Sequence, residues 1–369
     1  MRFTANENNT KITGRTIYRD GVRYLGYTGS SVSFRFKGKT VKAALVSDAS
    51  SHERRDYAWV AVFVKEEKDN EVSYGAVTDN EPYKRFCLDK DEAEYVLYES
   101  DEGKTVTVTL IKYSEAEYAA CGIKWIETDS EEILPPPADK KLKIEMIGDS
   151  ITCGYGNEGG VEQTQHDTSK ENPMGAYSLL TATHLDADVN VIAWNGKGVI
   201  TAYIGEDSLK VKDEDWLVPM LYEYTDAGCE RYYLHIPKDK WEKWDSSRFV
   251  PDIITIYLGT NDASYTDNDA SRNEEFITGY TKFLEKIRSM NHGIPILCML
   301  GTMDKRLCSS VEKAVELFNS KNNTNNVYYL ELPLQDEADG LGINWHPTVK
   351  THRKTAGLVE KKIKEILEN

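Results

Sequence analysis

Residues 142–152, LKIEMIGDSIT, decide the fold of the second half of the chain and contain its first candidate for chemistry. Residues 142–147 form a short apolar run of the kind that makes a buried strand. The tight turn Gly148-Asp149-Ser150 then leads into a helix, so it would expose the Ser150 hydroxyl and leave backbone N–H groups free at the helix start. Such donors can hold an oxyanion, and the stretch therefore predicts a strand, a reactive turn and a helix.

Four further stretches repeat the strand pattern downstream, with helical stretches between them. They are residues 189–194, 253–258, 296–300 and 327–330. Because strands and helices alternate, we predict an α/β domain with a five-stranded parallel sheet wound on both faces. Two apolar stripes at helical spacing support this prediction, and we expect both to be core: Phe276, Tyr280, Phe283, Leu284 and Ile287, and Ala356, Val359, Ile363 and Ile366.

The N-terminal part of the chain has a different pattern, made of short strands with Gly-rich punctuation. The predicted strands are residues 31–36, 41–46, 58–65, 94–98 and 105–112. They predict a small antiparallel β-sandwich, jelly-roll-like in form. The Pro-rich run at 134–139 breaks both helix and sheet, so the predicted organisation is a sandwich domain at 1–133, a linker at 134–141 and the α/β domain at 142–369.

Composition excludes several classes of partner. The chain has 369 residues and a net charge of −16, which repels nucleic-acid phosphates and anionic membranes. No apolar run reaches the roughly 20 residues that span a bilayer, and the N-terminus shows no secretory signal. We expect a cytoplasmic protein, or a secreted one whose signal was removed. The six cysteines lack CxxC spacing, which favours reduced, buried thiols over disulfides or a zinc site.

Ligands of an open parallel sheet bind beyond the carboxyl ends of its strands, so the residues that follow each strand are the candidates for a site. Ser150 follows the first strand. Gly196, after the second, would let the backbone approach a ligand closely, although a plain turn explains it almost as well. Asn261, after the third, places an amide donor at the same edge, with a helix cap or a turn as the alternative.

A hydrolytic serine needs a base, and seven histidines are available. His346 stands in the loop before the last helix, where the topology can bring it above Ser150. His352 is the back-up candidate, with a surface or packing role on the last helix as its simpler interpretation. His184, on a predicted helix, is expected to be structural. Cys153, close to Ser150, is expected to be a small buried hydrophobe rather than a second nucleophile.

Taken together, these motifs resemble the four ordered blocks of SGNH hydrolases: residues 148–152, 195–198, 259–262 and 345–347. The sandwich domain, the Gly154-Tyr155-Gly156 motif, residues 244–252 and the Trp-His-Pro-Thr-x-x-x-His ending resemble, more narrowly, carbohydrate esterase family two. This resemblance covers nearly the whole chain. It implies acetyl transfer without metal or organic cofactor.

The resemblance also implies roles for single residues. Ser150 would be the nucleophile and His346 the base, while the oxyanion hole would consist of the Ser150 N–H, the Gly196 N–H and the Asn261 side chain. Removal of one such donor typically costs about 100- to 1000-fold in rate.

The sequence departs from the superfamily where the Asp that orients the histidine is expected. Most relatives place it three residues before the His and some two before, but these positions are Ile343 and Asn344. An amide can accept a hydrogen bond from the imidazole without stabilising its positive charge. We therefore expect a Ser-His dyad, with His346 oriented by Asn344 or by a backbone carbonyl. Asp339 is an alternative acidic partner, although a solvated turn residue is its simpler interpretation.

The leading hypothesis is an esterase that removes O-acetyl groups from plant polysaccharides or oligosaccharides, such as acetylated xylan or mannan. A lipase or thioesterase of the same superfamily is one alternative. A carbohydrate-binding protein with degraded catalysis is another, motivated by the missing Asp and by the aromatic-rich insertion at 205–249. Trp345 is expected to contact substrate or to anchor the loop as a core ring, and Tyr265 is a second substrate-binding candidate. The sequence does not fix the oligomeric state.

Overall fold

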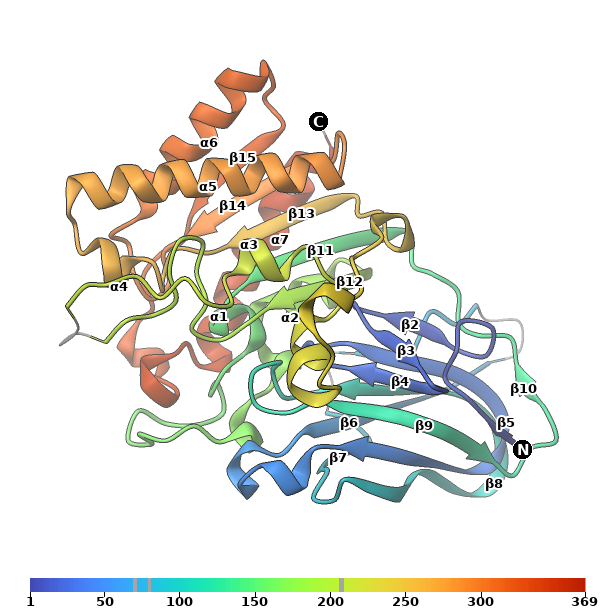
Figure 1. Ribbon diagram of the computed structural model, residues 1–369. Helices are drawn as coiled ribbons and strands as arrows, with labels where there is room; N and C mark the ends of the chain where they lie inside the picture. The colour runs from blue at the N-terminus through green and yellow to red at the C-terminus, as the bar shows by residue number, and fades with distance from the viewer. Residues whose placement is uncertain (69–71, 79–80, 206–208, 369) are drawn as a thin grey trace.

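The computed structural model describes residues 1–68, 72–78, 81–205 and 209–368. An antiparallel sheet forms the N-terminal half, and an α/β domain forms the C-terminal half (Figure 1). The N-terminal strands are β1 (Arg2–Phe3), β2 (Lys11–Thr13), β3 (Ile17–Arg19), β4 (Val22–Leu25), β5 (Ser31–Ser47), β6 (Trp59–Glu66), β7 (Lys84–Cys87), β8 (Glu92–Lys112), β9 (Cys121–Thr128) and β10 (Ile133–Leu134).

The N-terminal sheet is curled and antiparallel, with the strand order β3-β4-β9-β5-β8-β6-β7 along its main path. Apolar side chains from β5, β6, β8 and β9 meet inside it and form a core of their own. The prediction of separate strands at 31–36 and 41–46 was wrong, because both belong to β5. Likewise, 94–98 and 105–112 both belong to β8. The Gly-containing stretch around Gly38 makes an irregularity in the pairing of β5 with β8 instead of a turn, so the strands continue through it.

The C-terminal domain contains the five predicted strands, with helices between them and after the last one. They are β11 (Leu142–Gly148), α1 (Ser150–Cys153), α2 (Tyr177–His184), β12 (Ala187–Ala193), α3 (Val218–Leu221), β13 (Ile253–Tyr257), α4 (Ala263–Thr266), α5 (Ala270–Met290), β14 (Ile296–Leu300), α6 (Cys308–Asn322), β15 (Val327–Glu331) and α7 (Val349–Leu367). Periodicity did not predict the short helices α3 and α4. In the described residues the strands form a five-stranded parallel sheet of order β12-β11-β13-β14-β15, which confirms the predicted fold class.

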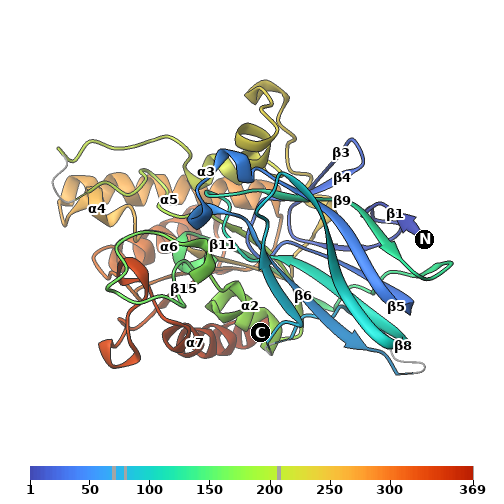
Figure 2. The ribbon, with the colours of Figure 1, turned by 90° about the horizontal axis from the view of Figure 1, so that it is seen from below.

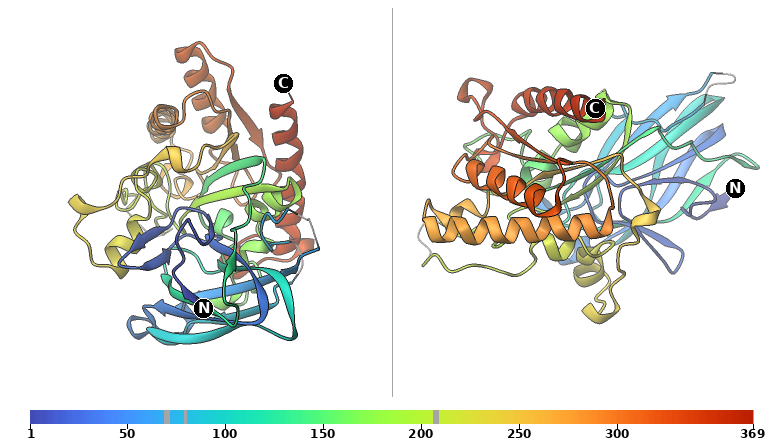
Figure 3. Two further views of the ribbon diagram at one scale, coloured as in Figure 1. Left: turned by 90° about the vertical axis from the view of Figure 1, so that its right-hand side faces the viewer. Right: turned by 90° about the horizontal axis from the view of Figure 1, so that it is seen from above.

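Helices cover both faces of the parallel sheet. Helices α5 and α6 pack together on one face, and α2 and α7 pack together on the other (Figures 2 and 3). Both predicted apolar stripes are buried, the first on α5 and the second on α7. The hydrophobic periodicity of these helices therefore reports their packing against the sheet.

The two halves share buried contacts. Lys11 of β2 forms a buried ion pair with Asp188 of β12 at 2.7 Å, and Arg15 forms one with Glu145 of β11 at 3.3 Å. One apolar core includes Phe63 from the N-terminal sheet together with residues of the parallel sheet. The N-terminal sheet is thus packed beside β12, the edge strand of the parallel sheet (Figure 1).

The aromatic-rich insertion packs against the body of the protein, and its residues 206–208 lie outside the described part. Trp216, Trp241 and Trp244 are all buried. The Trp216 ring lies 5.6 Å from the rings of both Trp194 and Trp241. These tryptophans therefore have a structural role.

Two further expectations concern the chain as a whole. Each of the six cysteines lies in the described part and is a free thiol, five of them buried. In the residues that the structure covers, every helix is too short or too polar to cross a membrane.

Candidate active site

Strand register brings three of the candidate residues to one edge of the sheet. Gly148 at the end of β11 is paired with Ala193 of β12 and with Tyr257 of β13. The loops that follow these three strands therefore begin side by side. They carry Ser150, Gly196 and Asn261, as the sequence pattern predicted.

Ser150 is the first residue of the short helix α1, and little of it is exposed. The preceding Asp149 caps this helix, because its Oδ1 accepts the Ile151 N–H at 3.0 Å. Burial raises the pKa of Asp149 to about 7, while this hydrogen bond partly opposes the shift. The cap fixes the turn and leaves the Ser150 side chain pointing to the histidine loop.

His346 lies against Ser150 across 196 positions of sequence, with Nε2 at 2.8 Å from Oγ. Its Nδ1 faces two backbone carbonyls, those of Ile343 at 3.0 Å and Asn344 at 3.2 Å. Because these oxygens only accept, Nδ1 must carry the proton, and Nε2 is then free to accept the Ser150 hydroxyl. Loss of water around the ring lowers the pKa of His346 to about 4, although both carbonyls oppose the shift. A neutral base therefore faces the serine at neutral pH.

The side chain of Asn344 does not orient His346, which corrects one of the two options left by the sequence. Its Nδ2 donates to the Tyr155 hydroxyl at 2.9 Å instead. Asn344 has φ of 51° and ψ of 41°, a left-handed conformation that Asn tolerates well. This conformation turns the side chain to Tyr155 and leaves the carbonyl of Ile343 as the nearest acceptor for the ring. Asp339 forms ion pairs with Lys350 and Lys354, so its carboxylate is engaged away from His346. With 4% of its side chain exposed, it is not the solvated turn residue of the simpler interpretation.

The histidine loop fits against the segment that follows α1. The Ile343 N–H donates to the Gly156 carbonyl at 3.2 Å, and the Tyr155 ring lies 4.4 Å from the His346 ring. Gly156 has φ of 56°, and a Cβ there would lie 2.6 Å from Cβ of Ile343. Only glycine satisfies both conditions. The motif Gly154-Tyr155-Gly156 therefore positions the loop that carries His346.

The two oxyanion candidates beyond Ser150 lie on loops with strong internal anchors. Gly196 adopts φ of 68°. Asn261 Nδ2 donates to the Lys197 carbonyl at 3.0 Å and to Asp149 Oδ2 at 3.3 Å. A bound oxyanion would accept one of these two N–H protons in place of its present acceptor. The bond to Asp149 is the longer, and therefore the weaker, of the two. The adjacent Asp262 accepts the N–H groups of residues 199–201 at 2.8 to 3.2 Å, which holds the Gly196 loop on that of Asn261.

The structure also places the remaining candidates. Trp345 is 61% exposed next to His346, so its ring is available to a ligand and is no core anchor. The Tyr265 hydroxyl donates to Glu275 at 3.0 Å, and the guanidinium of Arg272 lies over its ring. Both ends of the Tyr265 side chain are therefore engaged by residues of α5. His352 is buried and accepts the Tyr177 N–H at 3.2 Å, a packing role. Burial raises the pKa of the Cys153 thiol, as expected for an inert cysteine.

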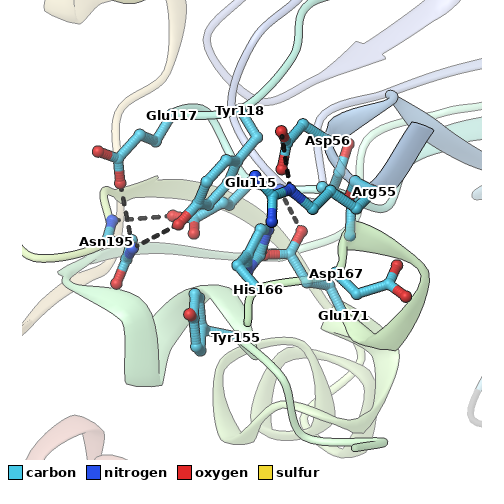
Figure 4. A network of polar contacts seen from close by, with 12 residues as sticks. Arg55, Asp56, Glu115, Glu117, Tyr118, Tyr155, His166, Asp167, Glu171 and Asn195 are labelled. Carbon is cyan, nitrogen blue, oxygen red and sulfur yellow. Dashed lines mark hydrogen bonds and ion pairs between the residues drawn. The ribbon is translucent and has the colours of Figure 1, made fainter. Parts of the chain in front are cut away.

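A polar cluster beside the site was missed by sequence reasoning (Figure 4). His166 stacks on Tyr118 at 3.6 Å and on Tyr155 at 4.8 Å. Glu115, from the connection between β8 and β9, is fully buried next to Glu171. Burial lowers the pKa of His166 to about 3 and raises the pKa of Glu171 to about 8. No local spacing marks these residues, because they meet only through the packing of the two halves.

Among the residues that the structure describes, no three His, Cys, Asp or Glu side chains are grouped so that they could hold a metal ion. The groups at the site are instead a hydroxyl, an imidazole and several N–H donors. This set can carry out acyl transfer through a serine.

Comparison with known families matches both halves of the chain. The profile of the GDSL-like lipase/acylhydrolase family matches residues 144–359. The profile of the carbohydrate esterase 2 N-terminal domain matches residues 12–137. The two matches lie on the α/β domain and on the curled sheet.

Individual proteins of known structure or sequence are similar over most of the chain. Cellulase/esterase CelE of Acetivibrio thermocellus is 30% identical over 80% of this chain, which spans only 34% of that longer protein. An acetylxylan esterase / glucomannan deacetylase of Cellvibrio japonicus is 25% identical, covering 99% of this chain and 91% of that protein. A family two carbohydrate esterase from Clostridium thermocellum, solved in complex with cellohexaose, has a TM-score of 0.80 at 27% identity, covering 97% of this chain and 99% of that one.

Proposed function

Because the chain belongs to the GDSL-like lipase/acylhydrolase family, and so to the carboxylic ester hydrolases, we propose that it removes O-acetyl groups from plant cell-wall polysaccharides or oligosaccharides. The observation that carries this proposal is the contact of His346 Nε2 with Ser150 Oγ at 2.8 Å. The nucleophile and its base are within hydrogen-bond reach, next to a set of N–H donors.

In the first half of the proposed reaction the enzyme becomes acetylated. His346 takes the hydroxyl proton of Ser150 while Oγ attacks the acetyl carbonyl carbon. The negative charge that develops on the carbonyl oxygen is stabilised by the N–H groups of Ser150 and Gly196 and by the side chain of Asn261. The bond to the sugar oxygen then breaks, and His346 gives its proton to that oxygen. The sugar leaves with a free hydroxyl.

In the second half, water replaces the sugar. His346 takes a proton from the water as its oxygen attacks the acetyl carbon, and the same donors stabilise the second oxyanion. The bond to Ser150 Oγ breaks, His346 returns the proton to Oγ, and acetate is released. No protein group outside the dyad has to gain or lose a proton.

A dyad of this form supports the imidazolium by dipoles rather than by a charge. The carbonyls of Ile343 and Asn344 accept from Nδ1, so they fix the ring and its tautomer. A carboxylate would add charge stabilisation, which these carbonyls do not replace in full. The lowered pKa keeps the ring neutral, and so able to accept a proton, down to a pH of about 4.

A carbohydrate substrate is supported by the exposed surface at the base and by the relatives. The exposed Trp345 ring stands beside His346, and aromatic faces bind sugar rings. The similar proteins are a cellulase/esterase of Acetivibrio thermocellus and an acetylxylan esterase / glucomannan deacetylase of Cellvibrio japonicus. We therefore propose acetylated xylan or mannan as the substrate class.

The test is acetate release from acetylated xylan by the wild-type chain and by Ser150→Ala. We expect the variant to lose more than about 1000-fold in kcat, as is usual when a serine nucleophile is removed. Ser310→Ala is a matched control, because Ser310 is also buried but lies on α6. Its activity should stay within about twofold of wild type, because the loss of a single hydroxyl that does not touch the reacting groups has a small effect.

Other outcomes would point to the other hypotheses. Equal acetate release by the wild type and Ser150→Ala would refute the serine mechanism. Sugar binding without any turnover that depends on Ser150 would favour a carbohydrate-binding protein. Rates on butyryl or octanoyl esters above those on acetyl esters would favour a lipase or thioesterase.

A further inference from the structure

Residues 113–120, the connection between β8 and β9, bring the N-terminal half into contact with the active-site loops. Lys112, the last residue of β8, is buried and donates from Nζ to the carbonyls of Ser114 at 2.6 Å and Glu115 at 2.8 Å. The Ser114 hydroxyl also accepts the Trp59 N–H at 3.1 Å. These bonds give the backbone of this connection a fixed position on the N-terminal sheet.

Glu115 bridges two loops of the α/β domain from this position. Its Oε2 accepts the backbone N–H of Asn195 at 2.8 Å. Its own backbone N–H donates to Glu171 Oε2 at 2.8 Å. Figure 4 shows Glu115 between Asn195 on one side and Glu171 on the other. One residue of the N-terminal half thus contacts the loop after β12 and the segment after α1.

The contact to Asn195 matters because Gly196 follows directly. The Asn195 N–H belongs to the peptide group immediately before the one whose N–H Gly196 would offer to the oxyanion. After Gly196 the loop is held by the Tyr203 N–H on the Gly196 carbonyl at 2.7 Å and by Asp262 further on. On the near side, the anchor of the backbone is the carboxylate of Glu115. A shift of about 1 Å in a catalytic group can lower the rate about 100-fold.

We propose that Glu115 is a positioning residue for ester hydrolysis, through which the N-terminal half sets the place of the Gly196 N–H in the oxyanion hole. This inference rests on the proposed function. It also gives the N-terminal half a role in the reaction that does not require it to bind sugar. What the position demands is a hydrogen-bond acceptor at the reach of a glutamate side chain, and not its charge.

The test compares three substitutions at this position in the full chain, with kcat and KM measured on an acetyl ester. Glu115→Gln keeps an acceptor oxygen at the same reach, so kcat should stay within about threefold of wild type. Glu115→Leu keeps the volume and removes the acceptor, so kcat should fall about 10- to 100-fold while KM changes less than about threefold. Glu115→Asp shortens the reach and should behave like Leu, which keeps the test decisive if the Leu variant does not fold.

Glu117→Gln is the matched control. Glu117 lies two residues along the same connection and accepts from the Asn195 side chain at 3.1 Å, so it does not hold the backbone. Its kcat should stay within about twofold of wild type. A folded Glu115→Leu or Glu115→Asp variant with wild-type kcat would overturn the proposal, and so would a Gln variant as impaired as Leu.

Hydrogen exchange separates this inference from the proposed function. The amides of residues 195–197 should exchange faster in Glu115→Leu than in wild type and at the wild-type rate in Glu115→Gln. An unchanged exchange rate in the Leu variant would overturn the positioning role. A wild-type chain without hydrolysis that depends on Ser150 would instead refute the proposed function, while this exchange measurement would still test the contact.

Discussion

The two halves of the active site are built in different ways. Ser150, Gly196 and Asn261 follow strands of one parallel sheet, and the pairing of Gly148 with Ala193 and Tyr257 brings their loops together. His346 instead lies on a loop whose position depends on contact with the segment after α1. Strand register brings the first group of residues together, whereas contacts between two loops position His346.

Backbone strain follows the same division. Asn344 and Trp345 both have positive φ, at 51° and 66°, and the bulky Trp345 is unfavourable in this region. Such strain persists only where the surroundings over-determine the conformation. The Gly342 N–H bonds to the His346 carbonyl at 2.8 Å and closes the loop on itself. The proposed oxyanion donors therefore follow paired strands, whereas the proposed base lies on a strained loop that a small change can displace.

The largest effect is expected at the site residues that follow strands of the parallel sheet. Asn261→Ala removes one donor to the oxyanion, so kcat on an acetyl ester should fall about 100- to 1000-fold with little change in KM. Steady-state kinetics measure both constants. The pairing of the strands should persist in this variant, because the hydrogen bonds of Asn261 Nδ2 go to Asp149 and Lys197, which lie outside the strands.

Asn291→Ala is the control for the loss of a buried amide. Asn291 is as buried as Asn261, and its Nδ2 donates to the Tyr222 hydroxyl at 2.8 Å, beyond the end of α5. It should lose stability but keep kcat within about twofold. A decrease in kcat as large as that of Asn261→Ala would mean that both variants act through the fold and not through the oxyanion.

An intermediate effect is expected at the contact that positions the loop of His346. Gly156→Ala would place a Cβ 2.6 Å from Ile343 Cβ and force the histidine loop to move. We expect kcat to fall about 10- to 100-fold, because the base loses its alignment with Ser150 while both catalytic side chains remain. The measurement is kcat on an acetyl ester together with the melting temperature.

Gly293→Ala separates displacement of the loop from backbone strain. Gly293 also has positive φ, at 76°, but no atom lies within 4 Å of its added Cβ. Both variants should be destabilised by about 1 kcal/mol or more, yet only Gly156→Ala should lose activity. Normal kcat in Gly156→Ala would show that the fit of Gly156 to Ile343 does not position the base.

Most of the fold could be predicted from local pattern. The parallel strands and the stripes of α5 and α7 follow from hydrophobic periodicity, which these buried elements express directly. The length of β5 could not be predicted in the same way. Gly38 ends a strand in a local reading, but in the sheet it becomes an irregularity that the pairing with β8 tolerates.

The site was predictable where its residues follow strands. Ser150 and Asn261 have that signal, and His346 was found as the histidine of the loop before the last helix. The sequence does not decide whether the Asn344 side chain or a backbone carbonyl accepts the hydrogen bond from the His346 ring. The answer depends on the φ angle of Asn344, which the amino-acid sequence alone does not reveal. Glu115 could not be found at all, since its role arises from the packing of one half of the chain on the other.

The smallest effect is expected from Asn344→Asp, which restores a carboxylate near the base. The side chain at 344 is exposed and points to Tyr155, so the new charge would be screened and would not touch His346.

The pH dependence of the reaction tests this expectation. The pKa of His346 is lowered to about 4, and the ring is neutral above that value. The kcat/KM of the wild type should therefore fall only as the pH drops toward 4, rather than near 6.5. In the variant we expect this acid limb to move by less than about half a pH unit and kcat to change less than about threefold. The pH profile of kcat/KM on an ester without titrating groups measures both, with Asn326→Asp as a distant control. An acid limb raised by a full unit together with a tenfold gain in kcat would show that the carboxylate reaches the ring, and the loop would then be mobile enough to convert the dyad into a triad.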